Sequence, residues 1–256
     1  MNILQLWREW QKESLNRNPE STKTRSLFQI ILILLLLISI FVGAMPGYLA
    51  GGQWRWSQLP KVPHLRAVKS VLDGLELPNW TITQHQQVRI GGQTWSVQVM
   101  GSERSEISKP LMLLLRPQNY YLDQPGVEWM DLNGLEQWKT DSEGQLNFTL
   151  SEGSDRRSIK TRFFRAWNRQ QTFAVVQWYA FPSGGGYSNF SWFWRDQIAQ
   201  LRRSRVPWIA ACLKIPIEPL ANLDEVQPLA ESLAREIQAH LFDRSLYSAN
   251  HLQKIN

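Results

Sequence analysis

The chain has few of the side chains that covalent or metal chemistry needs. Its single cysteine, Cys212, excludes an intramolecular disulfide. Cys212 lies in the apolar run Trp208–Leu213 with no histidine near it in sequence, which favours a small buried hydrophobe over a nucleophile. The four histidines lack metal-ligand spacing: His64, His85, His240 and His251. We predict no catalytic, cofactor-binding or metal-binding residues and no enzyme activity, unless distant residues assemble a hydrolase site in the fold.

The chain also lacks a strong excess of charge of one sign. It carries 28 basic and 22 acidic residues, and the net charge of +6 is spread along the sequence. The basic residues are too widely spread to indicate nucleic-acid binding. A basic excess beside a membrane span also fits attraction to anionic lipid head groups. The 43% of hydrophobic residues and the 13 tryptophans exclude wholesale disorder. We therefore predict one folded domain and no nucleic-acid partner.

No charged residue occurs between Ser26 and Trp54, and the segment Leu27–Met45 is almost wholly apolar. A helix of these 19 residues is roughly 28 Å long, close to the hydrocarbon thickness of a bilayer. The alternative is a cleaved signal peptide ending near the small residues Val42–Ala44. We favour an uncleaved single-pass anchor in the plasma membrane, because the run exceeds a usual signal core and follows a long polar tail.

The basic residues next to this run predict its orientation. Lys23 and Arg25 lie directly before it, whereas the first basic residue after it is Arg55. Basic residues tend to stay on the cytoplasmic side. We therefore expect a cytoplasmic N-terminus and an extracytoplasmic C-terminal domain.

We predict that the whole chain divides into five parts. They are a cytoplasmic tail at 1–26, the transmembrane helix at 27–45, a proline-rich linker with a short helix at 46–80, an extracytoplasmic domain at 81–244 and a polar tail at 245–256. The linker helix is indicated by apolar residues at helical spacing between His64 and Leu75.

Short strands separated by turn residues dominate the first part of this domain. A hairpin is indicated by alternating segments on either side of Gly91-Gly92, and a second by Ile159–Trp167 and Thr172–Phe181 around 168–171. Shorter strands are expected at Leu111–Leu115, Val127–Trp129 and Leu146–Leu150. The sheet should be largely antiparallel.

Helical periodicity follows the strands. Phe190, Phe193, Trp194, Ile198 and Leu201 fall on one helix face, and Pro207 ends that helix.

An apolar strand, Trp208–Ile215, comes next and should stop before Pro216. The last helix is expected to begin near a capping Asp224. Its core-facing stripe is Val226, Leu229, Leu233, Ile237 and Leu241. This order predicts an α+β fold in which C-terminal helices cover a mainly antiparallel sheet.

Two segments could bind an anion, and each has a simpler interpretation. The glycine run 184–186 precedes a helix, but no Lys-Ser/Thr pair follows it, so a flexible connection is favoured over a binding loop. A basic stripe could face a polyanion or lipid, although a solvated strand at the sheet edge explains it more simply. Its residues are Arg156, Arg157, Lys160, Arg162, Arg165 and Arg169.

Three C-terminal segments resemble small proteins that accompany cyanobacterial exosortases, the exosortase-associated family. They are Trp192–Gln197, Leu201–Trp208 and Ile215–Leu220, and Trp178-Tyr179 resembles the Trp-Tyr pair of a strand in such domains. The residues that match the pattern are Trp178, Tyr179, Trp192, Trp194, Arg195, Asp196 and Pro207. The resemblance covers about the last 85 residues, and the N-terminal anchor agrees with it in architecture only.

The resemblance implies a non-catalytic companion of a multi-pass exosortase, a protein-sorting enzyme often associated with exopolysaccharide production. The expected partners are the exosortase or its sorted substrates, with the bilayer contacted through residues 27–45. The resemblance carries over no functional site, and patterned aromatic residues are more often core than contact. An alternative is an extracytoplasmic binding module for an anionic ligand such as exopolysaccharide, suggested by the basic stripe and the many Trp and Tyr residues.

Overall fold

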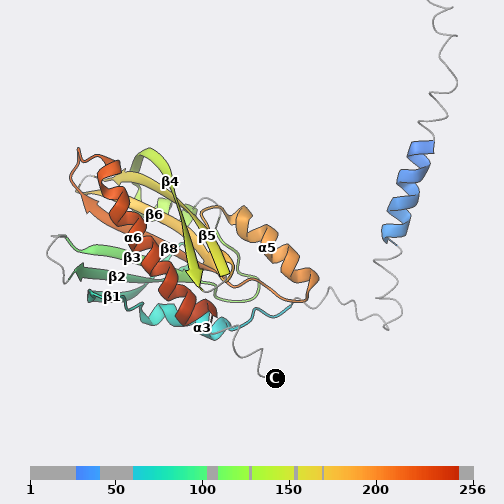
Figure 1. The fold of residues 1–256 in the computed structure, drawn as a ribbon, viewed down its shortest axis with the longest axis horizontal. Coiled ribbons are helices and arrows are strands. Elements are labelled where there is room, and N and C mark those ends of the chain that lie inside the picture. Colours follow the sequence, from blue (N-terminus) through green and yellow to red (C-terminus); the bar gives the residue numbers. More distant parts are fainter. Residues whose placement is uncertain are drawn as a thin grey trace, which may run out of the picture. The chain divides into compact units, whose positions relative to one another are not determined.

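The computed structural model describes residues 27–40, 60–102, 109–126, 129–152, 155–168 and 170–247. The chain divides into two compact units, Met1–Leu59 and Pro60–Asn256. In the first unit residues 27–40 are helical, drawn in blue in Figure 1. The remaining part of the expected span, 41–45, lies outside the described residues, as do 1–26, 46–59 and 248–256. None of the described helices is long and apolar enough to cross a membrane.

The second unit is a mixed α/β fold built on one eight-stranded sheet (Figure 1). The spatial order of its strands is β1-β2-β3-β8-β6-β7-β5-β4. The strands are β1 (Trp80–Ile90), β2 (Gln93–Ser102), β3 (Leu111–Pro117), β4 (Lys139–Glu152), β5 (Asp155–Trp167), β6 (Thr172–Phe181), β7 (Gly184–Gly186) and β8 (Ile209–Ile217). The helices are α3 (Leu65–Lys69), η1 (Ser70–Asp73), α4 (Met130–Glu136), α5 (Asn189–Leu201), α6 (Leu223–Leu241) and η3 (Phe242–Tyr247).

The pairing is antiparallel except between β5 and the short β7, so the expectation of a mainly antiparallel sheet is confirmed. The β1–β2 hairpin turns at Gly91 and Gly92, whose positive φ angles of 57° and 79° suit a tight hairpin turn. The predicted β5–β6 hairpin also forms, with Trp167 opposite Thr172.

Each face of the sheet carries its own hydrophobic core. On one face α6 and η3 pack on the central strands through residues such as Leu233, Ile237 and Leu246 (Figure 1). Of the predicted α6 stripe, Leu233, Ile237 and Leu241 are buried, and Val226 and Leu229 pack partly buried beside them. The other face buries a cluster rich in aromatic rings beneath α4 and α5, including Trp95, Trp192 and Trp208.

Several local predictions are wrong. Helix α5 ends at Leu201, well before Pro207. Pro216 lies inside β8, which is tolerated because β3 pairs with β8 only as far as Lys214. The cap of α6 is Asn222, whose side chain accepts a hydrogen bond from the Asp224 amide. Strand β5 is not an edge, because it pairs with both β4 and β6. Trp129, placed in a strand by its sequence, is the N-cap of α4.

The first and the last described segments of the second unit are packed into it. Val68 and Val71, in the predicted linker helix, are buried in the same core as α6. At the other end Ser245 and Leu246 are also buried, because the chain continues from α6 directly into η3. The packed structure therefore extends into residues predicted as a polar tail.

Candidate functional site

Helix α5 is held on the domain by a buried ion pair. Arg205 Nε donates to both carboxylate oxygens of Asp196 at 2.9 Å, and the two side chains are only 3% and 2% exposed. Asp196 also accepts from the Val206 amide at 2.9 Å and from Gln200 Nε2 at 2.8 Å. Because every lone pair region of the carboxylate faces a donor, the buried charge is well compensated. The inner face of α5 is therefore polar at its centre.

Two further contacts fix the same helix. Trp192 is buried, and its indole Nε1 donates to Val206 O at 2.9 Å. At the start of the helix Ser188 Oγ accepts from the Phe190 amide, a standard N-cap. The Trp192 indole thus ties the N-terminal half of α5 to the domain, and the Ser188 cap satisfies an amide in the first turn of the helix.

The outer face of α5 is apolar and exposed to solvent, which reverses the usual arrangement of an amphipathic helix. We call it the α5 apolar face, and its side chains are 40% to 86% exposed. Its residues are Phe190, Phe193, Trp194, Ile198 and Leu201. The rings of Phe190, Phe193 and Trp194 contact one another, with centroids 5.7 to 6.3 Å apart. The sequence predicted this stripe but not that it points away from the sheet.

A second exposed apolar segment adjoins this helix. Arg205 Nη1 donates to Tyr121 O at 3.0 Å, so the loop 120–122 is tied to the ion pair that anchors α5. Tyr120, Tyr121 and Leu122 are about half exposed. Nothing in the order of the sequence associates these residues with α5, because they are brought together by an arginine more than 80 positions away.

The residues that carry the family resemblance divide into a buried frame and an exposed pair. Trp178 and Tyr179 lie on opposite faces of β6: Trp178 Nε1 donates to Gln238 Oε1 at 2.7 Å, and Tyr179 stacks on Trp129 at 4.6 Å. Trp192, Asp196 and Pro207 are also buried. Trp194 and Arg195 are exposed on α5. Within this pattern Trp192 and Asp196 hold α5 on the domain, whereas Trp178 packs against α6.

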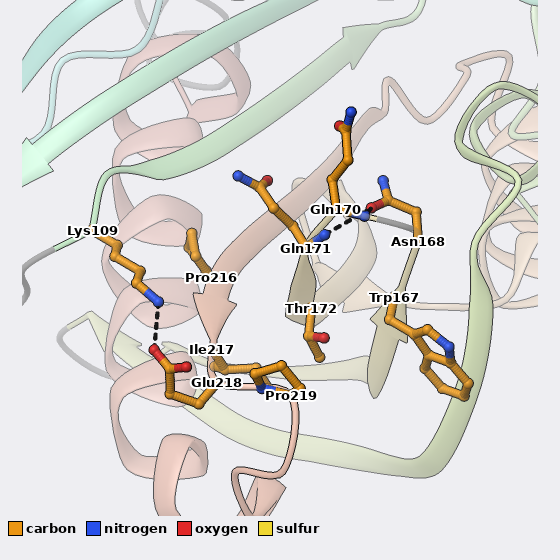
Figure 2. Close-up of a pocket in the computed structure, with 10 residues that line it drawn as sticks. All are labelled: Lys109, Trp167, Asn168, Gln170, Gln171, Thr172, Pro216, Ile217, Glu218 and Pro219. Carbon is orange, nitrogen blue, oxygen red and sulfur yellow. Dashed lines mark hydrogen bonds and ion pairs between the residues drawn. The ribbon is translucent and has the colours of Figure 1, made fainter.

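A polar cavity lies at the other end of β8, where the β5–β6 turn meets the end of that strand (Figure 2). Its volume is about 540 Å³. The Asn168 side chain accepts from the amides of Gln170 and Gln171, and Lys109 donates to Glu218 at 2.6 Å, which lowers the pKa of that carboxyl. Its walls offer amides and one ion pair, and none of these groups is an activated nucleophile.

Cys212 is buried and inert. Burial raises the pKa of its thiol to about 12, and its one hydrogen-bond partner is the amide of Gln177, at 3.7 Å from Sγ. The nearby Lys214 is paired with Glu136 at 2.8 Å. A neutral thiol next to an amide is a poor nucleophile. Cys212 therefore packs as a small apolar side chain, as its sequence context predicted.

The basic stripe is largely neutralised by acidic neighbours. Arg162 pairs with Glu143, and Arg165 forms a two-fold interaction with Asp141 at 2.8 Å. Hydrogen bonding from Arg165 lowers the pKa of Asp141. Arg157 pairs with Asp155, while Arg156 and Lys160 are exposed, and Arg169 lies outside the described residues. The sequence missed the pairs with Glu143 and Asp141 because these two residues lie on the neighbouring strand β4, whereas Asp155 lies on β5 itself.

The glycine run is neither a flexible connection nor a binding loop. It forms β7, a buried strand between β6 and β5. A Cβ on Gly184 would lie 2.4 Å from Ser158 O, and one on Gly186 would lie 2.3 Å from Ser191 Oγ. Glycine is needed at position 184, where φ is +135° and the close atom is a backbone carbonyl, whereas the atom closest to position 186 is a side-chain hydroxyl.

Across the described residues no group of three or more His, Cys, Asp or Glu side chains could hold a metal ion. His64 precedes α3, His85 lies in β1 and His240 in α6, while His251 is outside the described range. The structure brings none of them into a common site.

Comparison with known proteins identified no relative of this chain. No protein-family model matches the chain, and no curated protein or solved structure is significantly similar to it. The relation to exosortase-associated proteins stays a prediction from the motifs of the sequence. The arrangement that the structure adds to those motifs is α5, whose inner face is locked by Asp196 and whose outer face is apolar.

Proposed function

We propose that this chain is a non-catalytic accessory protein of an exosortase-type protein-sorting system. In this proposal residues 27–45 anchor it in the plasma membrane with the N-terminus in the cytoplasm. The folded unit Pro60–Asn256 then lies on the extracytoplasmic side and binds the exosortase or its substrates.

The observation that carries the proposal is the exposed α5 apolar face. Burying apolar surface is the main favourable term in folding and association, so a helix that turns such a face to solvent is typical of an interaction surface. The opposite face is the one that packs on the domain, through Trp192 and the Asp196–Arg205 pair. The fold therefore positions this helix for contact with something outside the domain.

The chemistry of the described residues supports a binding role over a catalytic one. The thiol of Cys212 is buried with a raised pKa. The buried carboxylates Asp123 and Asp196 each pair with an arginine, and the partly buried Glu136 pairs with Lys214. Carboxylates fixed in such pairs serve structure and are poorly placed to accept or release protons.

The test is purification of the tagged full-length chain from its native membrane in mild detergent, followed by mass spectrometry. We expect a multi-pass exosortase, or a protein with a C-terminal sorting segment, to accompany it. Replacing Phe193, Trp194 and Ile198 together by serine should lower the recovery of this partner, because the face either contacts the partner or positions the domain beside it. The matched control is Leu220→Ser, because Leu220 is 96% exposed and lies in the turn after β8. Recovery of the tagged chain alone from wild-type membranes would contradict the proposal.

A second candidate function is binding of an anionic extracytoplasmic ligand such as exopolysaccharide. The exposed Arg156 and Lys160 on β5 favour it, since unshielded basic residues attract polyanions. Salt-sensitive retention of the protein on an acidic polysaccharide column, lost in Arg156→Gln/Lys160→Gln, would support this role. Retention that is unchanged in that variant would exclude these residues as the binding site.

A further inference from the structure

The α5 apolar face needs an occupant, and its composition points to one. It combines three aromatic and two aliphatic side chains along a helix of 13 residues, about 20 Å long. Arg195, Arg202 and Arg203 flank it and are exposed. The only acidic residue of the segment 189–205 is Asp196, and its charge is buried in the ion pair. The exposed surface of α5 is therefore apolar along its centre and cationic beside it.

This pattern is typical of a helix that lies in the plane of a membrane surface. Such helices place Trp, Phe and Leu among the upper acyl chains, while Lys and Arg contact lipid phosphates. Trp194 suits the interface especially well, because an indole has an apolar body and one polar edge. The exposed side chains of Tyr120, Tyr121 and Leu122, tied to α5 through Arg205, extend the same kind of surface.

The chain limits how far the folded unit can lie from an anchored helix. Only positions 41–59 separate the apolar helix at 27–40 from Pro60, where the folded unit begins. A chain of that length spans at most about 65 Å when fully extended. If the apolar helix is anchored, the folded unit therefore stays near lipid, and weak interfacial binding through α5 suffices to hold it there.

We propose that the α5 apolar face binds the anionic lipid surface of the membrane in which the chain is anchored. The inference rests on the proposed function for the anchor at residues 27–45, and it names what the exposed face of the domain contacts. Helix α5 then fixes the domain against the bilayer. The remaining surfaces, including the polar cavity at the far end of β8, are left for other partners.

The experiment places a nitroxide spin label on the full-length chain in vesicles that mix phosphatidylcholine with phosphatidylglycerol. The native Cys212 is fully buried, so a cysteine introduced at the surface is the one that reacts. Ile198→Cys reports the α5 apolar face, and Leu220→Cys is the matched control. Residue 220 follows the end of β8 that is remote from α5, about 30 Å along the strand.

We expect the label at residue 198 to collide mainly with lipid-soluble oxygen and the label at residue 220 mainly with a water-soluble nickel chelate. Replacing Arg202 or Arg203 by Gln should lower the ratio of membrane-bound to aqueous label at residue 198 by about fivefold for each arginine. The reason is that one basic residue near an anionic surface contributes ~1 kcal/mol. Vesicles of phosphatidylcholine alone should produce a similar shift.

Two results would overturn the proposal. One is a label at residue 198 that stays aqueous both in vesicles and in native membranes. The other is a label that is aqueous in vesicles of the pure chain but shielded in native membranes, which would assign the face to a protein. Affinity purification tests the accessory role separately from lipid binding. If an exosortase partner is recovered but the label at residue 198 stays aqueous, only the lipid proposal is contradicted.

Discussion

Asp196 and Arg205 lie nine positions apart, one inside α5 and one in the segment before β8, and Arg205 Nε is 2.9 Å from both carboxylate oxygens. The pair is almost fully buried and is joined by the Val206 amide and Gln200. It determines which face of α5 meets the domain. Trp192 and the paired Asp196 face the domain, while the five residues of the α5 apolar face point outward.

Removing one member of this pair should destabilise the fold strongly. Asp196→Ala leaves the Arg205 guanidinium buried without its counter-charge, and we expect the free energy of unfolding to fall by about 3–5 kcal/mol. Urea denaturation followed by tryptophan fluorescence measures the change. The control is Glu231→Gln, which removes a partly exposed pair with Arg235 and should cost about 0.5 kcal/mol or less. Equal losses in the two variants would mean that the buried pair has no special role.

Gly184 should not tolerate a side chain. Its φ angle is +135°, and a Cβ would meet Ser158 O at 2.4 Å. We expect Gly184→Ala to lower the free energy of unfolding by about 2 kcal/mol or more, from backbone strain and overpacking. Gly134→Ala is the control, because that position in α4 has open space around it and alanine favours helix. A stable Gly184→Ala protein would show that β7 can move away from β5 at little cost.

Cys212 should resist alkylation in the native protein and react after unfolding in urea. Its burial, partly offset by the Gln177 amide, raises the pKa from 9.0 to about 12. Because the folded state holds the neutral thiol, the associated stability is complete below about pH 9 and is lost as the pH rises toward 12. Denaturation at alkaline pH should therefore show a smaller decline in Cys212→Ala than in the wild type. Rapid native alkylation would show that this part of the sheet opens frequently.

The Arg165–Asp141 interaction should be visible in an acid titration. The hydrogen bond from Arg165 lowers the pKa of Asp141 below 3.8, so the interaction stabilises the fold above that pH and is lost as the pH falls through the lowered pKa. Nuclear magnetic resonance of the carboxyl carbon should show the pKa returning toward 3.8 in Arg165→Gln. Arg66→Gln, which removes an exposed charge on α3, should leave it unchanged. An Asp141 midpoint that does not respond to Arg165→Gln would contradict the pairing.

Local sequence patterns predicted most of the strands and helices of the second unit. The alternation around Gly91-Gly92, the paired strands on either side of 168–171 and the α6 stripe are local signals, because side-chain periods and turn residues act over a few positions. Errors occurred where a distant neighbour decides the outcome. Pro216 fits inside β8 only because β3 has already stopped pairing there, and 184–186 becomes a strand because β5 and β6 flank it.

The sequence by itself determined the long apolar run at 27–45, the lone unreactive cysteine, the antiparallel sheet and the apolar stripe of α5, since each depends on composition or on short-range periodicity. Tertiary structure alone decided which face of α5 is buried, which arginines of the basic stripe are neutralised and which loop lies beside α5. These outcomes depend on contacts between residues far apart in the chain, such as Arg205 with Tyr121 and Arg165 with Asp141. The α5 stripe is a candidate interaction surface because it is exposed to solvent, which helical periodicity alone does not determine.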